Sequence, residues 1–323
     1  MESSPGNVGP FEAIEKKLIL GVEHGQLRSL PRTFWDEVCV LANCAIVQHT
    51  TEKDVDTYVL SESSLFVTDT VVMLKTCGTT QPLSALQLLL DAVGKEQVTF
   101  VWYNRMSYLG SGSVQPYQHQ TFSREVAVLH KFFPSGEHRT LPVHVCPSAR
   151  TAALKLKTNL FNAFFYAKES SVLPELSFEE WIFYRIGHDA QDAFVDQVLT
   201  PLKGAVVDKE YFEPCGFSCN AIMPNETLNV HISPEDEVAY ASVEITRLKD
   251  LTTCPGWAFL LFSTFKPVVG VQVRVDIRKL SDLLLNGLSV TCYWNQDLPL
   301  PTVSYESDKE LDMRTSMCAG GIT

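Results

Sequence analysis

Strand-like segments alternate with helix-like segments along the first half of this 323-residue chain, and this alternation limits the folds open to it. Residues 57–67 and 70–75 are rich in β-branched and aromatic side chains, which favours strands. Residues 83–93 form a strongly apolar helical run, and Ser123 is placed to cap another amphipathic helix over residues 124–133. The pattern predicts one or more sheets that pack against helices.

The second half of the chain shows the same kinds of segment. Residues 228–233 and 238–245 are typical of paired strands, and residues 257–262 and 268–277 of two more. No repeat is visible at the level of single residues, so an internal duplication is a hypothesis. A parallel α/β sheet and an antiparallel sheet with helices on its outer face both fit these segments.

Composition places the chain among ordinary globular proteins, with 45% hydrophobic and 20% charged residues. The formal net charge of −12 argues against nucleic acid and anionic membranes as partners, and it is compatible with a cationic ligand. No run of about 18 apolar residues and no secretory signal is visible. The nine cysteines include no CxxC pair, which indicates reduced thiols in the cytoplasm and no metal site.

Five short motifs carry most of the functional information. YVLSESSLFV (58–67) places a serine directly after a glutamate in a strand–turn–strand setting, and LKTCGTT (74–80) follows it. Taken alone, SESS is typical of a polar turn and a lone cysteine of a small core residue. FEAIEK (11–16), FEPCGFSCNAI (212–222) and HISPEDEVAYASVE (231–244) complete the set.

In this order and spacing the motifs resemble those of eukaryotic S-adenosylmethionine decarboxylase proenzymes, with the plant enzymes closest in character. The helix-like FSREVAVL (122–129) fits the same family, whereas residues 140–205 match weakly and no diagnostic motif follows residue 246. The resemblance implies a single domain over residues 1–323. Its fold would be an α+β, four-layer α/β/β/α sandwich of two antiparallel sheets flanked by helices.

The resemblance also implies that the proenzyme cuts its own backbone between Glu62 and Ser63, into a β chain (1–62) and an α chain (63–323). Ser63 Oγ would attack the Glu62 carbonyl to give an ester, and elimination would leave a pyruvoyl group derived from Ser63. His231 matches the base for the elimination, a task that suits a pKa near neutrality. Ser218 matches a serine that assists through hydrogen bonding.

By the same resemblance, the covalent pyruvoyl cofactor would form a Schiff base with S-adenosylmethionine and withdraw electrons as CO2 leaves. The product would serve spermidine and spermine biosynthesis. Cys77 matches the proton donor to the substrate carbon. Glu12 and Glu15 match two glutamates of the N-terminal motif, of which the second is needed for catalysis.

Substrate-binding positions follow from the same motifs. Phe11 and Phe212 match two aromatic residues that sandwich the adenine, an arrangement that also suits a nearby sulfonium. Glu235 matches the acceptor for the ribose hydroxyls. Leu60 and Glu62, which directly precede the cleavage point, are further substrate-binding candidates.

A buried charged site is expected beside these residues. Animal relatives bind putrescine there as an activator, whereas plant relatives carry an arginine that supplies the charge. Lys17 falls at that arginine position, and Ile19 replaces a glutamate. The other candidates for this charge-relay or activator region are Lys75, Arg105, Glu244 and Glu180.

A rival hypothesis is that the chain is a weak or inactive regulatory paralogue that binds an active decarboxylase. Retention of the serine, cysteine, histidine and glutamates together favours the active enzyme. The sequence leaves open whether the processed unit is a monomer or a homodimer.

Overall fold

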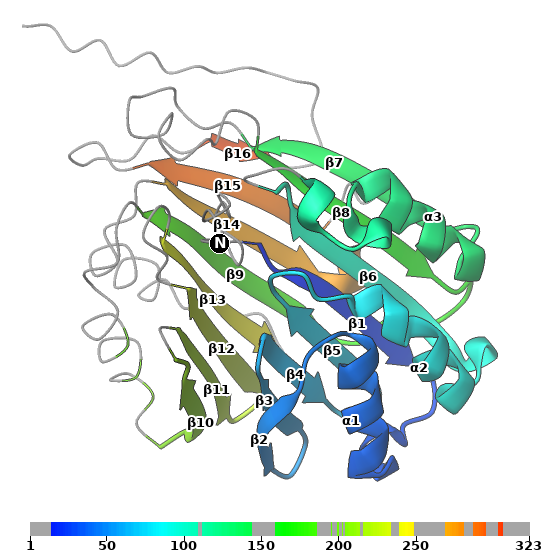
Figure 1. Ribbon diagram of the computed structural model, residues 1–323. Coiled ribbons are helices and arrows are strands. Elements are labelled where there is room, and N and C mark those ends of the chain that lie inside the picture. The colour runs from blue at the N-terminus through cyan, green and yellow to red at the C-terminus, as the bar shows by residue number, and fades with distance from the viewer. Residues whose placement is uncertain are drawn as a thin grey trace, which may run out of the picture.

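Two antiparallel sheets of eight strands each lie face to face in the computed structural model (Figure 1). The structure describes residues 14–108, 112–143, 159–185, 195, 199, 202, 204–213, 216–233, 239–248, 269–280, 287–294 and 303–305. Sheet A has the order β2-β3-β4-β5-β1-β6-β8-β7, and sheet B has the order β10-β11-β12-β13-β9-β14-β15-β16. The antiparallel alternative is therefore the correct one.

The strands of sheet A are β1 (Lys16–Val22), β2 (Ile46–Thr51), β3 (Asp56–Leu60), β4 (Ser63–Val67), β5 (Val71–Thr76), β6 (Val98–Met106), β7 (Glu137–Val143) and β8 (Asn159–Ala167). Those of sheet B are β9 (Ser177–Arg185), β10 (Val206–Tyr211), β11 (Phe217–Met223), β12 (Glu226–Ser233), β13 (Ala239–Arg247), β14 (Val269–Asp276), β15 (Leu288–Trp294) and β16 (Val303–Tyr305).

Three α-helices cover the outer face of sheet A: α1 (Arg32–Leu41), α2 (Leu86–Val93) and α3 (Phe122–Phe132) (Figure 1). Helix α3 begins two residues earlier than predicted, because the Thr121 hydroxyl rather than Ser123 caps it by accepting a hydrogen bond from the Arg124 N–H (3.3 Å). Short 3-10 helices lie at Leu27–Ser29, Pro82–Ala85, Lys95–Gln97, Gly112–Val114, Tyr117–His119 and Ile277–Lys279.

Strand β1 shows how alternation builds the layers. Leu18 and Leu20 point outward into a core that they share with the buried faces of the helices. Ile19 points inward, into the core between the two sheets. Because side chains alternate along a strand, Lys17 faces the same way as Ile19 and Lys16 the opposite way. This division decides where the charged residues of β1 lie.

The outer face of sheet B also carries a core, to which Trp181, Phe217 and Val230 contribute. Val195 and Leu202 pack on it, and Leu199 lies against it. These residues are the described part of the expected outer layer on this side. The predicted strand at 257–262 lies outside the described residues.

The two sheets share a topology. In each, the first strand (β1 or β9) is central, the next four strands lie in a meander on one side, and the sixth strand lies on the other. The orders differ at the far edge, where β7 lies outside β8 but β15 lies inside β16. This shared order supports the hypothesis of an internal duplication that single residues do not reveal.

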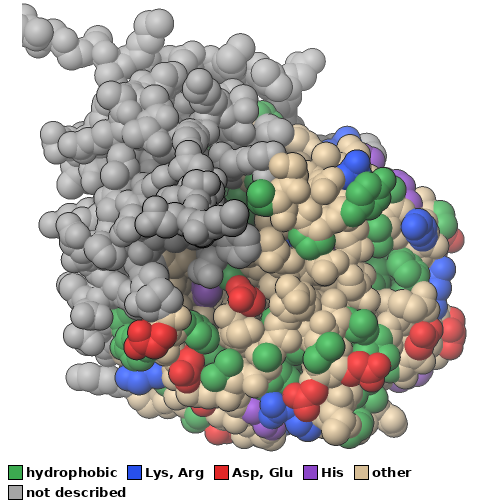
Figure 2. All heavy atoms as spheres, in the orientation of Figure 1, with side chains coloured by type: hydrophobic (Ala, Val, Ile, Leu, Met, Phe, Trp, Pro, Cys, Tyr) green, Lys and Arg blue, Asp and Glu red, His purple; other side chains and the backbone are tan. Residues whose placement is uncertain are grey.

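Among the described helices, none has the length and apolar character needed to cross a membrane. On the face drawn in Figure 2, the acidic and basic side chains of the described residues are interspersed, without a broad basic area.

Candidate active site

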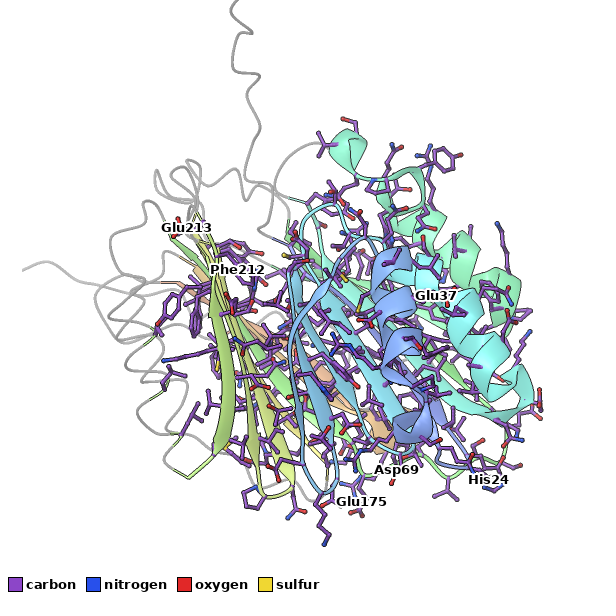
Figure 3. The ribbon with its side chains drawn as sticks, turned by 60° about the horizontal axis from the view of Figure 1, so that its bottom comes forward. His24, Glu37, Asp69, Glu175, Phe212 and Glu213 are labelled. Carbon is purple, nitrogen blue, oxygen red and sulfur yellow. The ribbon has the colours of Figure 1, made fainter. Side chains whose placement is uncertain are left out.

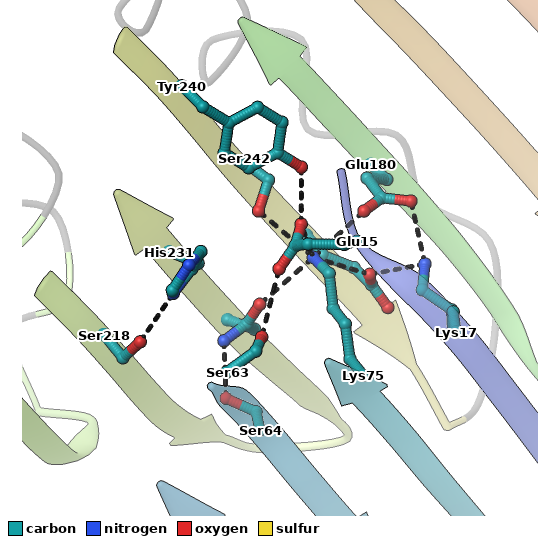
Figure 4. Close-up of polar contacts among 12 residues, drawn as sticks. Glu15, Lys17, Ser63, Ser64, Lys75, Glu180, Ser218, His231, Tyr240 and Ser242 are labelled. Atoms are coloured by element: carbon teal, nitrogen blue, oxygen red, sulfur yellow. Dashed lines mark hydrogen bonds and ion pairs between the residues drawn. The ribbon is translucent and has the colours of Figure 1, made fainter. Parts of the chain in front are cut away.

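A layer of charged side chains is buried between the sheets. Lys17 and Lys75 are register neighbours on β1 and β5, and Glu180 and Glu244 are register neighbours on β9 and β13. The two lysines of sheet A face the two glutamates of sheet B, and Figure 4 shows Lys17, Lys75 and Glu180 in this arrangement. Lys17 Nζ lies 2.9 Å from Glu180 Oε2 and 2.5 Å from Glu244 Oε2. Lys75 Nζ lies 2.9 Å from Glu180 Oε1 and 3.3 Å from Glu244 Oε2.

Glu15 joins this layer through Lys75, whose Nζ lies 3.0 Å from Glu15 Oε2. Burial raises the pKa of Glu15, but Lys75 and His231 together hold it below its usual value. Burial also opposes ionisation of Glu180, yet Lys17 and Lys75 lower the pKa of its carboxyl to about 2. The three glutamates outweigh the effect of burial on Lys75 and raise its pKa. Glu15, Glu180 and Lys75 therefore stay ionised at neutral pH, as paired buried charges can.

The serine identified from the sequence lies at the edge of this layer. Ser63 begins β4, directly after the Ser61–Glu62 turn, and it is fully buried. Its Oγ donates a hydrogen bond to Glu15 Oε1 at 3.0 Å (Figure 4). Its φ of 126° is a conformation that costs a residue with a side chain about 1–3 kcal/mol. The backbone is thus strained at the bond predicted to be cut.

The peptide bond before Ser63 is held from the neighbouring loop. The Cys77 backbone N–H donates to the Glu62 carbonyl oxygen at 2.9 Å. The Cys77 thiol donates to the Glu62 carboxylate at 3.4 Å (Sγ to Oε2). The structure therefore brings together Glu62, Ser63, Cys77 and Glu15, as the sequence predicted.

Ser218 and His231 form a pair on β11 and β12, where they are register neighbours. Ser218 Oγ lies 2.7 Å from His231 Nδ1 (Figure 4), and Ser233 Oγ lies 3.2 Å from His231 Nε2. Both ring nitrogens are thus engaged, which fixes the orientation of the imidazole. His231 is near enough to Glu15 to help lower the pKa of its carboxyl.

Several polar residues of the site were not predicted. The Tyr240 hydroxyl donates to Glu15 Oε2 at 2.7 Å, and Lys75 Nζ donates to Ser242 Oγ at 3.2 Å. Tyr240, Ser242 and Glu244 alternate along β13, as residues on one face of a strand do. This spacing of two is visible in the sequence and could have identified them.

A second unpredicted set holds the residue after Ser63. Ser64 Oγ donates to Asn220 Oδ1 at 2.6 Å and accepts from Asn229 Nδ2 at 2.7 Å. Asn220 also donates to the Tyr58 carbonyl oxygen at 3.0 Å. Sheet B is therefore hydrogen-bonded to the β3–β4 hairpin through side chains on β11 and β12.

Arg105 was expected at the charged layer, and the structure places it elsewhere. In the β1–β6 register Arg105 pairs with Lys16, and Asn104 pairs with Lys17. Arg105 therefore points to the helix side of sheet A, where its Nε lies 2.7 Å from Glu125 Oε2 on α3. The prediction was wrong because it did not account for the alternation of side chains along β6.

The remaining predicted residues differ in how far the structure describes them. Leu60 packs in the core between sheet A and the helices, so only its backbone, which pairs with Ser63, faces the site. Phe212 is half-buried and lies at the end of the sandwich away from Asp69 (Figure 3). Asp69 follows the far end of β4, so Phe212 lies toward the end that holds Ser63. The other three, Phe11, Glu12 and Glu235, lie outside the described residues.

A surface pocket of about 440 Å³ lies at the opposite end of the sandwich from Ser63. Turns at residues 52–55, 68–71, 174–176 and 222–225 line it. None of its lining residues belongs to the buried polar layer, so this pocket is not the candidate active site.

The fold and the site define a two-sheet α+β protein with an enclosed, charged site of the kind found in enzymes. The chain belongs to the adenosylmethionine decarboxylase family, whose model matches residues 10–145 and 154–269. The match includes residues 154–205, where the motifs alone gave only a weak resemblance to the family. The family prediction is thereby confirmed.

Proteins named S-adenosylmethionine decarboxylase proenzyme are similar to this chain. The one from Zea mays is 31% identical over 270 residues, which cover 76% of this chain and 66% of that protein. The one from Caenorhabditis elegans is 32% identical, with 72% and 68% covered. Proenzyme 2 from Brassica juncea is 32% identical, with 72% and 69% covered. The matched region thus spans about two thirds of the length of these relatives.

A crystal structure of the Trypanosoma brucei AdoMetDC-delta26 monomer also matches, with a TM-score of 0.45 and 20% identity, and the match covers 68% of this chain and 82% of that one.

Proposed function

We propose that this chain decarboxylates S-adenosylmethionine after cutting its own backbone between Glu62 and Ser63. The observation that carries the proposal is the state of that bond. A buried serine with a strained backbone follows it, a carboxylate accepts the serine hydroxyl hydrogen, and a backbone N–H holds the carbonyl oxygen. These are the parts that an attack by a side chain on its own peptide bond needs.

The first step is an N→O acyl shift. Ser63 Oγ bonds to the Glu62 carbonyl carbon, the C–N bond breaks, and the hydroxyl proton passes to the freed amine. Glu15 is positioned to accept that proton on the way, because it stays ionised and already accepts the Ser63 hydrogen bond. The Cys77 N–H stabilises the charge that develops on the Glu62 oxygen.

The second step is an elimination. His231, held by Ser218, removes the α-proton of residue 63, and the Oγ–Cβ bond breaks to release the Glu62 carboxylate. The dehydroalanine that remains takes up water and loses ammonia, which leaves a pyruvoyl group at position 63. The enclosed position beside Glu15 fits such a group.

The pyruvoyl group supplies the carbonyl that withdraws electrons during decarboxylation. Cys77, whose thiol contacts the residue before the cleavage point, supplies the proton to the substrate carbon. Phe11 and Phe212 hold the adenine, Glu235 holds the ribose, and Leu60, Glu62 and Glu12 complete the substrate site.

The charged layer lets the site work without a bound diamine. Lys17 places an ammonium between Glu180 and Glu244 and lies over the Phe178 ring at 3.9 Å. Ile19 contributes an apolar side chain to the core between the sheets, where a carboxylate would help to hold a second cation. The fixed lysine thus supplies the positive charge that an activator would bring.

The cut chains stay together in this account. Strand β1 lies between β5 and β6, and β3 lies between β2 and β4. Two strands of the N-terminal chain, β1 and β3, are therefore hydrogen-bonded to strands of the C-terminal chain. A role in polyamine synthesis, a cytoplasmic location and a monomeric or homodimeric state of the processed unit stay predictions.

The test measures cleavage of the chain and decarboxylation of the substrate in the same protein. Purified wild type should separate into two chains on a denaturing gel and release labelled CO2 from carboxyl-labelled S-adenosylmethionine. Ser63→Ala should remain one chain and release none. A wild type that stays intact yet decarboxylates would contradict the proposal. One that stays intact and inactive would favour the regulatory paralogue.

A further inference from the structure

A second buried polar cluster lies on the helix side of sheet A. It contains Lys16 on β1, Tyr103 and Arg105 on β6, Glu125 on α3, and His119 on the 3-10 helix Tyr117–His119. Glu125 accepts hydrogen bonds from Tyr103 (2.7 Å) and Arg105 (2.7 Å) and contacts His119 Nδ1 (2.8 Å). No step proposed above uses these residues.

Lys16 differs from the rest of the cluster in what it binds. Its side chain is fully buried, and its Nζ donates to the carbonyl oxygens of Gly78 (2.7 Å) and Thr80 (3.1 Å). Burying an ammonium is costly unless its hydrogens are bonded. Its two described acceptors both belong to the loop that follows β5.

That loop is compact, and its first residue contacts the cleavage site. The Thr80 hydroxyl donates to the Cys77 carbonyl oxygen at 2.6 Å and lies 2.8 Å from Thr76 Oγ1. Gly78 has a φ of 59°, which glycine adopts without strain. The Cys77 N–H at the start of the loop donates to the Glu62 carbonyl oxygen. Lys16 is thus linked through one short loop to the carbonyl that Ser63 would attack.

We propose that Lys16 is a positioning residue for self-cleavage, which holds the 77–80 loop so that the Cys77 N–H points at the Glu62 carbonyl oxygen. This inference rests on the proposed function. A misplacement of about 1 Å at a reacting centre can slow a reaction about a hundredfold, so a buried clamp on the loop has a large effect. The ammonium also favours negative charge nearby, and it interacts with Glu62 and Cys77.

The charge of Lys16 depends on pH in a useful range. Burial lowers its pKa to about 8, against the effects of Glu125, Cys77 and Glu62, which raise it, while Arg105 lowers it further. Burial also lowers the pKa of the neighbouring His119 and raises that of Tyr103. The ammonium is therefore present below about pH 8 and lost above it, so the rate of self-cleavage should fall as pH rises through that value.

The test compares rates of self-cleavage, which need no pyruvoyl group. Lys16→Met keeps the length of the side chain and removes its charge and donors. The matched control is Lys168→Met, which removes a part-exposed lysine that donates to a backbone carbonyl, that of Glu96 (2.9 Å). Lys16→Met should cut at least about tenfold more slowly, and Lys168→Met should cut like wild type. In a His231→Ala background, Lys16→Met should also lower the amount of ester that hydroxylamine cleaves.

Equal rates for Lys16→Met and wild type would overturn the role of Lys16 and leave the proposed function intact. A wild type that never cuts would refute the proposed function itself. If Lys16→Met does not fold, the pH profile decides. Wild type and Cys77→Ala, which keeps the N–H and lacks the thiol, should both slow above about pH 8. A rate that is level or rising to pH 9.5 would overturn the inference.

Discussion

Removal of the Ser64 hydroxyl should slow self-cleavage by releasing the strain at Ser63. Ser64 connects the β3–β4 hairpin to sheet B through hydrogen bonds with Asn220 and Asn229. In Ser64→Ala both of these hydrogen bonds are lost, and the backbone at Ser63 is free to move toward an ordinary φ. The proenzyme variant then no longer stores the strain that Ser63 carries at its φ of 126°.

The magnitude follows from that strain. A residue in such a conformation stores about 1–3 kcal/mol, and each 1.4 kcal/mol or so on a barrier is a factor of ten in rate. Ser64→Ala should therefore cut roughly 5- to 150-fold more slowly. Its stability should change little, because the loss of two hydrogen bonds at about 1 kcal/mol each offsets the strain released. Asn229 Nδ2 also keeps Asn220 Oδ1 as a partner at 3.2 Å.

The assay is a time course of intact proenzyme on denaturing gels after rapid release from denaturant, with melting temperatures measured on Ser63→Ala backgrounds. Ser84→Ala is the control, since it removes a hydroxyl that accepts a hydrogen bond from Gln118 (2.7 Å) away from the hairpin. A Ser64→Ala protein that cuts as fast as wild type, with an unchanged melting temperature, would refute the argument from strain.

Four further outcomes are expected. Cys77→Ala should still cut itself but lose most turnover of S-adenosylmethionine, as single-turnover CO2 release would show; full turnover would remove the thiol from protonation. His231→Ala should accumulate an ester that hydroxylamine cleaves, and normal processing would exclude His231 as the base. Wild-type initial rates should change little with putrescine. Strong stimulation of the wild type by putrescine would contradict a built-in positive charge. Lys17→Leu should be less stable than wild type by about 3–5 kcal/mol, because Lys75 is then the only lysine paired with Glu180 and Glu244 among the described ion pairs.

Residues close together in the sequence were the most predictable part of the site. The turn at Glu62, the strands on both sides of it and the Cys77 loop follow from local pattern, because a hairpin brings such residues together without help from the rest of the fold. The side on which Lys17 lies also follows from alternation along β1, once one apolar neighbour is assigned to a core.

Contacts between the sheets could not be predicted in this way. Ser64 meets Asn220 and Asn229 across more than 150 residues of chain, and only the stacking of sheet B on sheet A places them together. Arg105 was misplaced for a related reason, since its side of β6 depends on the register with β1. The shared strand order of the two sheets likewise requires the topology and has no counterpart in single residues.

The identity of residue 63 after cleavage tests the central claim most directly. Mass spectrometry of the first peptide of the larger chain should show a residue lighter than serine by one ammonia, with no free amine, and the smaller chain should end at Glu62. A larger chain that begins with an ordinary serine, or a wild type that is active with the Glu62–Ser63 bond intact, would contradict the account.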